Sequence, residues 1–217
     1  MKALMENLPN YIVNPQIEKY LTGLTPADDK ILNEMQELGK ERNFPIIGPL
    51  VGRLLYLITQ AVKARRVFEM GSGFGYSSYW FAKAVGEGGD VIFSELSKKN
   101  ALHAQDFFRR GELEERIEIH VGDSLELLDE LQGEFDIIFN DIDKEQYPLV
   151  VERAYNKLKK GGLLITDNVL WFGRILTDDD SQSTQGIREF TRILLSEKGF
   201  FTTIIPIRDG ISLSLKL

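Results

Sequence analysis

Oxygen-bearing side chains with a lysine among them occur in two short stretches of the sequence, Asp141–Lys144 and Asp167–Asn168. Each stretch directly follows an apolar run that reads as a buried strand. Because parallel strands end at the same edge of a sheet, Asp141, Asp167 and Asn168 are expected to lie near one another. Without cysteine or a neighbouring histidine, such donors suit a hard cation, namely Mg²⁺, Mn²⁺ or Ca²⁺. The alternative is that they are helix caps and turn residues, but two acidic strand ends with an adjacent amide favour the metal site.

Lys144 stands three residues after Asp141. On a surface loop a lysine is usually just solvated. Beside a divalent cation its ammonium form is disfavoured, so the amine can accept a proton near neutral pH. The same cation would acidify a bound hydroxyl group. We therefore predict that Lys144 is a general base.

A second candidate site is the glycine-rich segment Glu69–Gly75, which follows the β-rich run Val67–Met70 and precedes an expected helix. Glycines let the backbone approach a ligand closely, and a helix N-terminus offers unpaired N–H groups with a partial positive charge. The segment is therefore predicted to be a cofactor loop rather than only a tight turn. Glu69 is either a ligand contact or a carboxylate that braces the loop.

Two further positions are expected at the same edge of the sheet. Glu95 comes twenty residues after Gly75, at the end of the expected strand Asp90–Glu95. An acidic side chain there can accept hydrogen bonds from both ribose hydroxyls of a nucleotide. Asp123 and Ser124 follow the next strand, where they either border an adenine or act as helix N-caps.

The glycine loop and Glu95 alone fit NAD as well as S-adenosylmethionine. Three features favour S-adenosylmethionine. Tyr76 stands where the dehydrogenase fingerprint places its third glycine. Some sixty residues that read as helical precede the loop, and the chain ends in an expected hairpin that fits a methyltransferase sheet.

These residues are carried by alternating β-rich and helical runs, which indicate consecutive βαβ units. The expected strands are Val67–Met70, Asp90–Ser94, Arg116–Val121, Phe135–Asn140 and Leu163–Thr166, and the helices between them are Tyr76–Val85, Lys98–Arg110, Leu125–Leu131 and Tyr147–Leu158. Asp209-Gly210 between the runs Phe200–Ile207 and Ile211–Leu217 signals a hairpin. The predicted fold is α/β and Rossmann-like, with a mostly parallel seven-stranded sheet, one C-terminal antiparallel hairpin strand and extra N-terminal helices.

The N-terminal helices are expected from a start at Pro26–Asp28 and a second helix over Gly48–Lys63. With 217 residues, we expect a single domain over residues 1–217, composed of N-terminal helices (1–64) and a sheet core (65–217). The net charge of −7 argues against binding nucleic acid mainly through its phosphates. The absence of cysteine excludes disulfides and cysteine nucleophiles. No signal peptide or membrane span is apparent, so a cytoplasmic location is expected.

Taken together, these motifs resemble the cation-dependent O-methyltransferases related to catechol and caffeoyl-CoA O-methyltransferases, especially their bacterial members. The similarity runs from about Tyr20 to the C-terminus and rests on Pro45–Gly52, Glu69–Ser77, Glu95, Asp141–Lys144, Asp167–Trp171 and Pro206–Gly210. The resemblance implies transfer of the sulfonium methyl group of S-adenosylmethionine to a metal-bound phenolic oxygen. It also implies a small phenolic substrate and a homodimer.

The resemblance further implies roles for individual residues. Asp141, Asp167 and Asn168 match the metal ligands, and Lys144 matches the general base. The predicted cofactor-binding residues are Ile47, Glu69, Gly71, Ser77, Glu95, Asp123, Ser124 and Asp141.

Three features limit the transfer of these roles. Ile142 stands where the animal catechol enzymes have a histidine, and Arg208 interrupts the Pro-Ile-Gly-Asp-Gly pattern common in bacterial members. Phe172–Gly186 is read as a polar, acidic loop in the region that shapes acceptor choice.

Two alternative functions remain open from the sequence. One is methyl transfer to RNA or protein, and the other is cofactor binding without catalysis.

Overall fold

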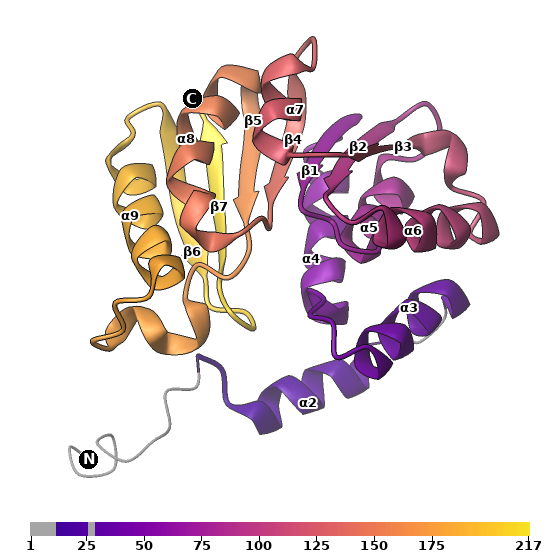
Figure 1. Ribbon diagram of the computed structural model, residues 1–217, viewed down its shortest axis with the longest axis horizontal. Coiled ribbons are helices and arrows are strands. Elements are labelled where there is room, and N and C mark those ends of the chain that lie inside the picture. Colours follow the sequence, from indigo (N-terminus) through magenta and orange to yellow (C-terminus); the bar gives the residue numbers. More distant parts are fainter. Residues whose placement is uncertain (1–11, 26–28) are drawn as a thin grey trace.

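The strands form one seven-stranded sheet in the order β3-β2-β1-β4-β5-β7-β6 (Figure 1). The structure is a computed structural model and describes residues 12–25 and 29–217. The strands are β1 (Arg66–Met70), β2 (Asp90–Glu95), β3 (Ile117–Val121), β4 (Phe135–Asn140), β5 (Leu158–Thr166), β6 (Phe200–Ile205) and β7 (Ile211–Lys216). β7 runs antiparallel to both β5 and β6, and the other pairs are parallel. The predicted mostly parallel sheet with one antiparallel hairpin strand is confirmed.

The strand register explains how distant stretches of sequence meet. Met70 at the end of β1 is paired with Asn140 of β4, and Asn140 is paired with Thr166 of β5. The residues that follow, Gly71, Asp141 and Asp167, therefore leave the sheet side by side. The strand order changes direction between β1 and β4, the position at which doubly wound sheets open a ligand crevice.

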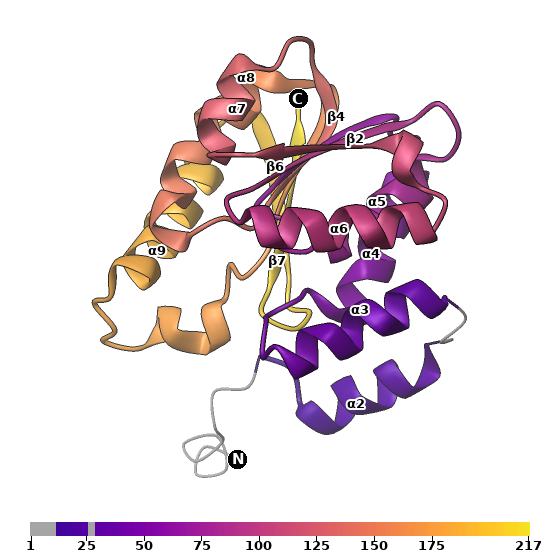
Figure 2. The same ribbon diagram turned by 45° about the vertical axis from the view of Figure 1, so that its right-hand side comes forward.

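Helices cover both faces of this sheet (Figures 1 and 2). They are α2 (Pro15–Leu24), α3 (Lys30–Glu41), α4 (Gly48–Ala61), α5 (Tyr76–Val85), α6 (Lys98–Arg110), α7 (Ser124–Glu130), α8 (Val150–Lys157) and α9 (Gln182–Ser196), with short 3₁₀ turns η1 (Glu114–Arg116), η2 (Lys144–Leu149) and η3 (Trp171–Leu176). Ile137 and Phe139 of β4 pack in the core with α3 to α6, whereas Ile138 packs with α7 to α9. Burial on both faces explains why this strand lacks polar alternation.

α2 differs from the α-helices that follow it in burial. None of its residues is buried, and Ile17, Tyr20, Leu21 and Leu24 are exposed. α3 begins at Lys30, and the Asp29 carboxylate accepts hydrogen bonds from the backbone N–H groups of Ile31 and Leu32. The helix start predicted at Pro26–Asp28 lies outside the described residues. In the described ranges, no helix is long and apolar enough to cross a membrane.

Part of the segment predicted as a polar loop, Phe172–Gly186, is helical. α9 begins at Gln182, where the Ser181 hydroxyl accepts a hydrogen bond from the Thr184 backbone N–H. The apolar positions that anchor this helix, Ile187, Phe190 and Leu194, lie beyond the polar stretch and are buried in the core. The first turn of α9 is polar, so the sequence pattern gave no sign that an amphipathic helix begins there.

Candidate functional site

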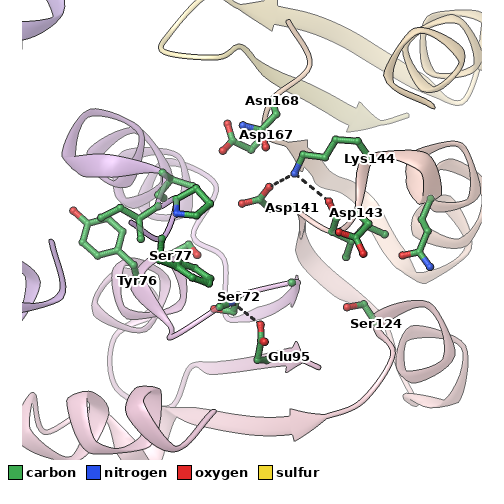
Figure 3. Close-up of a pocket in the computed structure, with 18 of the residues that line it drawn as sticks. Ser72, Tyr76, Ser77, Glu95, Ser124, Asp141, Asp143, Lys144, Asp167 and Asn168 are labelled. Atoms are coloured by element: carbon green, nitrogen blue, oxygen red, sulfur yellow. Dashed lines mark hydrogen bonds and ion pairs between the residues drawn. The ribbon is translucent and has the colours of Figure 1, made fainter. Parts of the chain in front are cut away.

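A pocket of about 510 Å³ opens at the carboxyl ends of the parallel strands (Figure 3). Ten of the eleven predicted site residues line it. They are Ile47, Gly71, Ser77, Glu95, Asp123, Ser124, Asp141, Lys144, Asp167 and Asn168. Figure 3 shows Lys144 beside Asp141, Tyr76 and Ser77 on one side of this pair, and Glu95 and Ser124 on another. Apart from Glu69, the predicted cofactor residues thus share one cavity with the predicted metal residues.

The glycine loop is fixed directly against the acidic strand end. Gly71 has a φ of +80°, and a Cβ there would lie 2.7 Å from the backbone oxygen of Asp141. Any larger residue would meet both strain and a backbone clash. Gly75, with a φ of +88°, leads into α5, whose first turn carries Tyr76 and Ser77 to the pocket.

Glu69 is the predicted site residue that does not line the pocket. Its side chain is fully buried behind the loop and accepts hydrogen bonds from the Ser77 and Ser78 hydroxyls. The geometry favours the bracing role over direct ligand contact. Burial raises the pKa of Glu69 to about 7, although the serine hydrogen bonds act in the opposite direction.

This raised pKa makes the stability of the protein pH-dependent. In the unfolded chain Glu69 ionises above its ordinary pKa of 4.5, whereas the folded chain keeps the proton until about pH 7. The folded state therefore binds more protons in this window, and its stability falls as pH rises from 4.5 to 7. Glu69→Gln removes this titrating group. The free energy of unfolding of the variant, relative to that of wild type, should therefore be higher at pH 8 than at pH 4 by up to about 3 kcal/mol. Urea unfolding at both pH values measures this change, and an unchanged difference would contradict it.

Glu95 and the Asp123–Ser124 turn form the far end of the pocket. The Glu95 carboxylate accepts hydrogen bonds from the Gly73 backbone N–H at 2.9 Å and the Ser97 N–H at 2.8 Å. It therefore ties the glycine loop to the end of β2. Asp123 caps α7 by accepting from the N–H groups of Leu125 and Glu126, and it lines the pocket as well. Capping and ligand contact, the two roles left open from sequence, are compatible here.

Asp141 and Asp167, here called the acidic cluster, lie with Lys144 in the pocket. Lys144 Nζ donates to Asp141 Oδ1 at 2.8 Å and to the Ile142 carbonyl at 3.0 Å. The same ammonium group lies over the Tyr147 ring, 5.2 Å from its centroid. Asp167 is buried, and burial together with the charge of Asp141 raises its pKa to about 7. Burial also raises the pKa of Asp141, and Lys144 opposes that rise.

The donor set fits a hard cation. Two carboxylates and an amide are oxygen donors of the type that Mg²⁺, Mn²⁺ and Ca²⁺ prefer. The Asn168 amide nitrogen donates to Asp209 Oδ2 at 3.3 Å, so its carbonyl oxygen remains available as a ligand. A cation would also offset the repulsion between Asp141 and Asp167. Within residues 12–25 and 29–217, no three His, Cys, Asp or Glu side chains form a metal cluster, and the predicted set itself has only two such side chains.

Several pocket residues were not predicted from sequence. Trp171 and Phe172 form an aromatic wall beside Lys144, and Arg208 reaches the pocket from the turn between β6 and β7. Together with Asn168, these residues have φ values between +47° and +60°. Such left-handed backbone is strained for most residues other than glycine, and strain of this kind concentrates at functional sites. Asp209, read only as a turn residue, accepts hydrogen bonds from Asn168 and from the Phe172 backbone N–H.

Comparison with known proteins identifies relatives over nearly the whole chain. The model of a family described as O-methyltransferase matches residues 24–217. A catechol O-methyltransferase of Mycobacterium tuberculosis is 29% identical over 97% of this chain and 98% of its own length. Caffeoyl-CoA O-methyltransferase 2 of Populus trichocarpa is 26% identical over 90% of this chain and 85% of its own. An O-methyltransferase from Bacillus cereus, crystallised in complex with SAH, superposes with a TM-score of 0.85 at 28% identity, covering 93% of this chain and 97% of the other.

Proposed function

The chain belongs to the family of S-adenosylmethionine-dependent O-methyltransferases, and on this premise we propose that it methylates a hydroxyl group of a small catechol-like or phenylpropanoid acceptor with the help of a divalent cation. The observation that carries the proposal is the single pocket that joins the glycine loop to Asp141, Asp167, Asn168 and Lys144. The activities for which these relatives are named, catechol and caffeoyl-CoA O-methylation, support this acceptor class.

The cofactor half of the pocket would hold S-adenosylmethionine by its polar groups. Glu95 would accept hydrogen bonds from the ribose hydroxyls, and Ser124 would border the adenine. Ser77 and the backbone at Ile47 and Gly71 would contact the methionine portion. Gly71 packs against the Asp141 backbone, so these contacts would hold the cofactor next to the acidic cluster.

In the other half, Asp141, Asp167 and Asn168 would hold the cation. When bound, S-adenosylmethionine supplies an electrophilic methyl group, and a divalent cation favours the ionised form of a nearby hydroxyl group. Lys144 would accept the acceptor's hydroxyl proton at Nζ once its amine is neutral, the form that a divalent cation beside it favours. Trp171 and Phe172 would flank the aromatic ring of the acceptor. The methyl group would pass from the sulfonium sulfur to the acceptor oxygen, which would leave S-adenosylhomocysteine as the second product. Alignment and electrostatics would provide most of the rate.

The direct test is a screen of catechols, caffeoyl esters and flavonoids with S-adenosylmethionine and Mg²⁺ or Mn²⁺. Each reaction is run with and without chelator. We expect methylated product from at least one vicinal diol, lost on chelation and restored by added cation. Turnover of a small acceptor that is indifferent to chelation would contradict the role of the cation. Turnover confined to bulk RNA or protein substrates would favour the alternative acceptors, and the net charge of −7 argues against RNA.

We also propose that the chain forms a homodimer through its N-terminal helices. α2 and α4 expose apolar side chains, among them Tyr20, Leu24 and Leu57, beside a groove of about 750 Å³ between α2, α3, α4 and α5. Contiguous exposed apolar surface is typical of protein interfaces. Sedimentation velocity tests this proposal, because a dimer would have twice the chain mass of 24.7 kDa. The assignment of residues 1–217 to one domain and the cytoplasmic location stay predictions.

A further inference from the structure

Arg208 is a positively charged pocket residue to which the mechanism gives no role. It lies in the turn between β6 and β7, which the reversed direction of β7 brings to the pocket. Among the described residues that line the pocket, the only lysine or arginine side chains are Lys144 and Arg208. Lys144 is already bonded to Asp141 and to the Ile142 carbonyl. Arg208 is therefore the positively charged pocket side chain that remains available to bind a ligand.

The guanidinium group of Arg208 is only partly used by the protein. Nη1 donates to the Ile46 carbonyl at 2.6 Å, and Nε lies 3.9 Å from a Glu18 carboxylate oxygen. Neither Nε nor Nη2 makes a hydrogen bond within the part of the chain that the structure describes. The side chain is 31% exposed. An arginine has five N–H donors in a planar fork, so an edge of the group remains free to bind an anion.

The backbone at Arg208 is left-handed, with a φ of +47°, a conformation that favours glycine. The turn itself therefore does not favour an arginine at this position.

The neighbours of Arg208 locate it at one end of the pocket. Its Nη1 lies against Gly48, where an added Cβ would meet it at 3.4 Å, and it bonds Ile46 directly before Ile47. Arg208 lines the same pocket as Tyr76, Asp141 and Asp167. The adenosine would occupy the other end, at Glu95 and Ser124.

We propose that Arg208 is a carboxylate-binding residue of this pocket. The carboxylate could come from the methionine portion of the cofactor or from an acidic acceptor, since both would reach the space between Tyr76 and the acidic cluster. A guanidinium group suits either source because it can bind both oxygens of a carboxylate side by side. The inference rests on the proposed binding of cofactor and acceptor in this pocket.

The test compares ligands that differ only in the carboxylate. Titration calorimetry would measure binding of S-adenosylmethionine and of its decarboxylated form to wild type, Arg208→Gln and the control Arg109→Gln, an exposed position on α6. If Arg208 binds the cofactor carboxylate, Arg208→Gln should weaken binding of S-adenosylmethionine by roughly 10- to 100-fold and binding of the decarboxylated form by less than about 3-fold. Arg109→Gln should alter neither affinity.

A second arm identifies an acceptor carboxylate. The KM values of catechol and 3,4-dihydroxybenzoate are compared in the same proteins, and a selective rise for the acid in Arg208→Gln assigns the acceptor as the source. If Arg208→Gln affects acidic and non-acidic ligands equally in both arms, Arg208 only joins the turn to Ile46 and Glu18, and the inference is overturned. Failure of the wild-type protein to bind either cofactor form would instead count against the proposed function.

Discussion

Lys144→Ala should lower kcat by about 10²- to 10⁴-fold while changing the affinity for S-adenosylmethionine by less than about 3-fold, as expected for loss of a general base. The side chain lies 2.8 Å from Asp141 in the predicted acceptor half of the pocket, away from Glu95 and Ser124. Its removal takes away the proton acceptor and leaves the glycine loop intact. The effect should therefore appear in turnover and not in cofactor binding.

Two measurements separate this result from simple misfolding. Cofactor binding is followed by calorimetry and turnover by product formation, with Lys99→Ala on the exposed start of α6 as the matched lysine control. Lys144→Arg keeps the positive charge but cannot lose its proton near neutral pH, so it should be nearly as slow as Lys144→Ala. An arginine variant with wild-type turnover would show that Lys144 acts only through its charge.

The second large effect is expected from substitution of the carboxylates that are predicted to bind the metal, Asp141 and Asp167. Asp167→Asn should weaken Mn²⁺ binding by at least about tenfold, equivalent to roughly 1.4 kcal/mol, and should greatly reduce cation-dependent turnover. Asp167 is buried and has no ion pair to Lys144, so the substitution removes one charge without releasing the lysine. Asp141→Asn should have a similar effect on the metal, with the added consequence that Lys144 loses its partner.

Mn²⁺ titration by calorimetry gives a readout that does not depend on turnover. Asp90→Asn, at the opposite end of β2, is the control for loss of a carboxylate and should leave Mn²⁺ affinity unchanged. An Asp141→Asn or Asp167→Asn protein that retained wild-type activity in the presence of chelator would falsify the metal role. Equal Mn²⁺ affinities in wild type and both variants would place the cation elsewhere.

The parts of the fold set by strong local patterns could be predicted from the sequence. The alternation of β-rich and helical runs gave the parallel core, and Asp209-Gly210 gave the hairpin that carries the antiparallel strand. The meeting of Gly71, Asp141 and Asp167 could be predicted because parallel strands end at one edge, and the observed register brings these residues together. In each case a local rule and the sheet geometry agree.

Other parts of the site depend on contacts that no local pattern contains. The sequence left two roles open for Glu69, and only its burial and its bonds to Ser77 and Ser78 favour one of them. The pocket position of Arg208 depends on Ile46, which is 162 residues away in the chain. Trp171 and Phe172 reach the pocket through a strained turn held by Asp209, and nothing in their spacing indicates positive φ values.

The single reversed strand has a consequence for how this enzyme could diversify. In a wholly parallel sheet each segment that reaches the crevice leads from a strand into a helix, so changing it disturbs a packed layer. Because β7 is antiparallel to β6, the two strands are joined by a hairpin turn, residues 206–210, which also reaches the crevice. Such a turn can exchange residues without repacking a helix. Substitutions in this turn, natural or engineered, could therefore change ligand preference while the residues at the ends of the parallel strands stay the same.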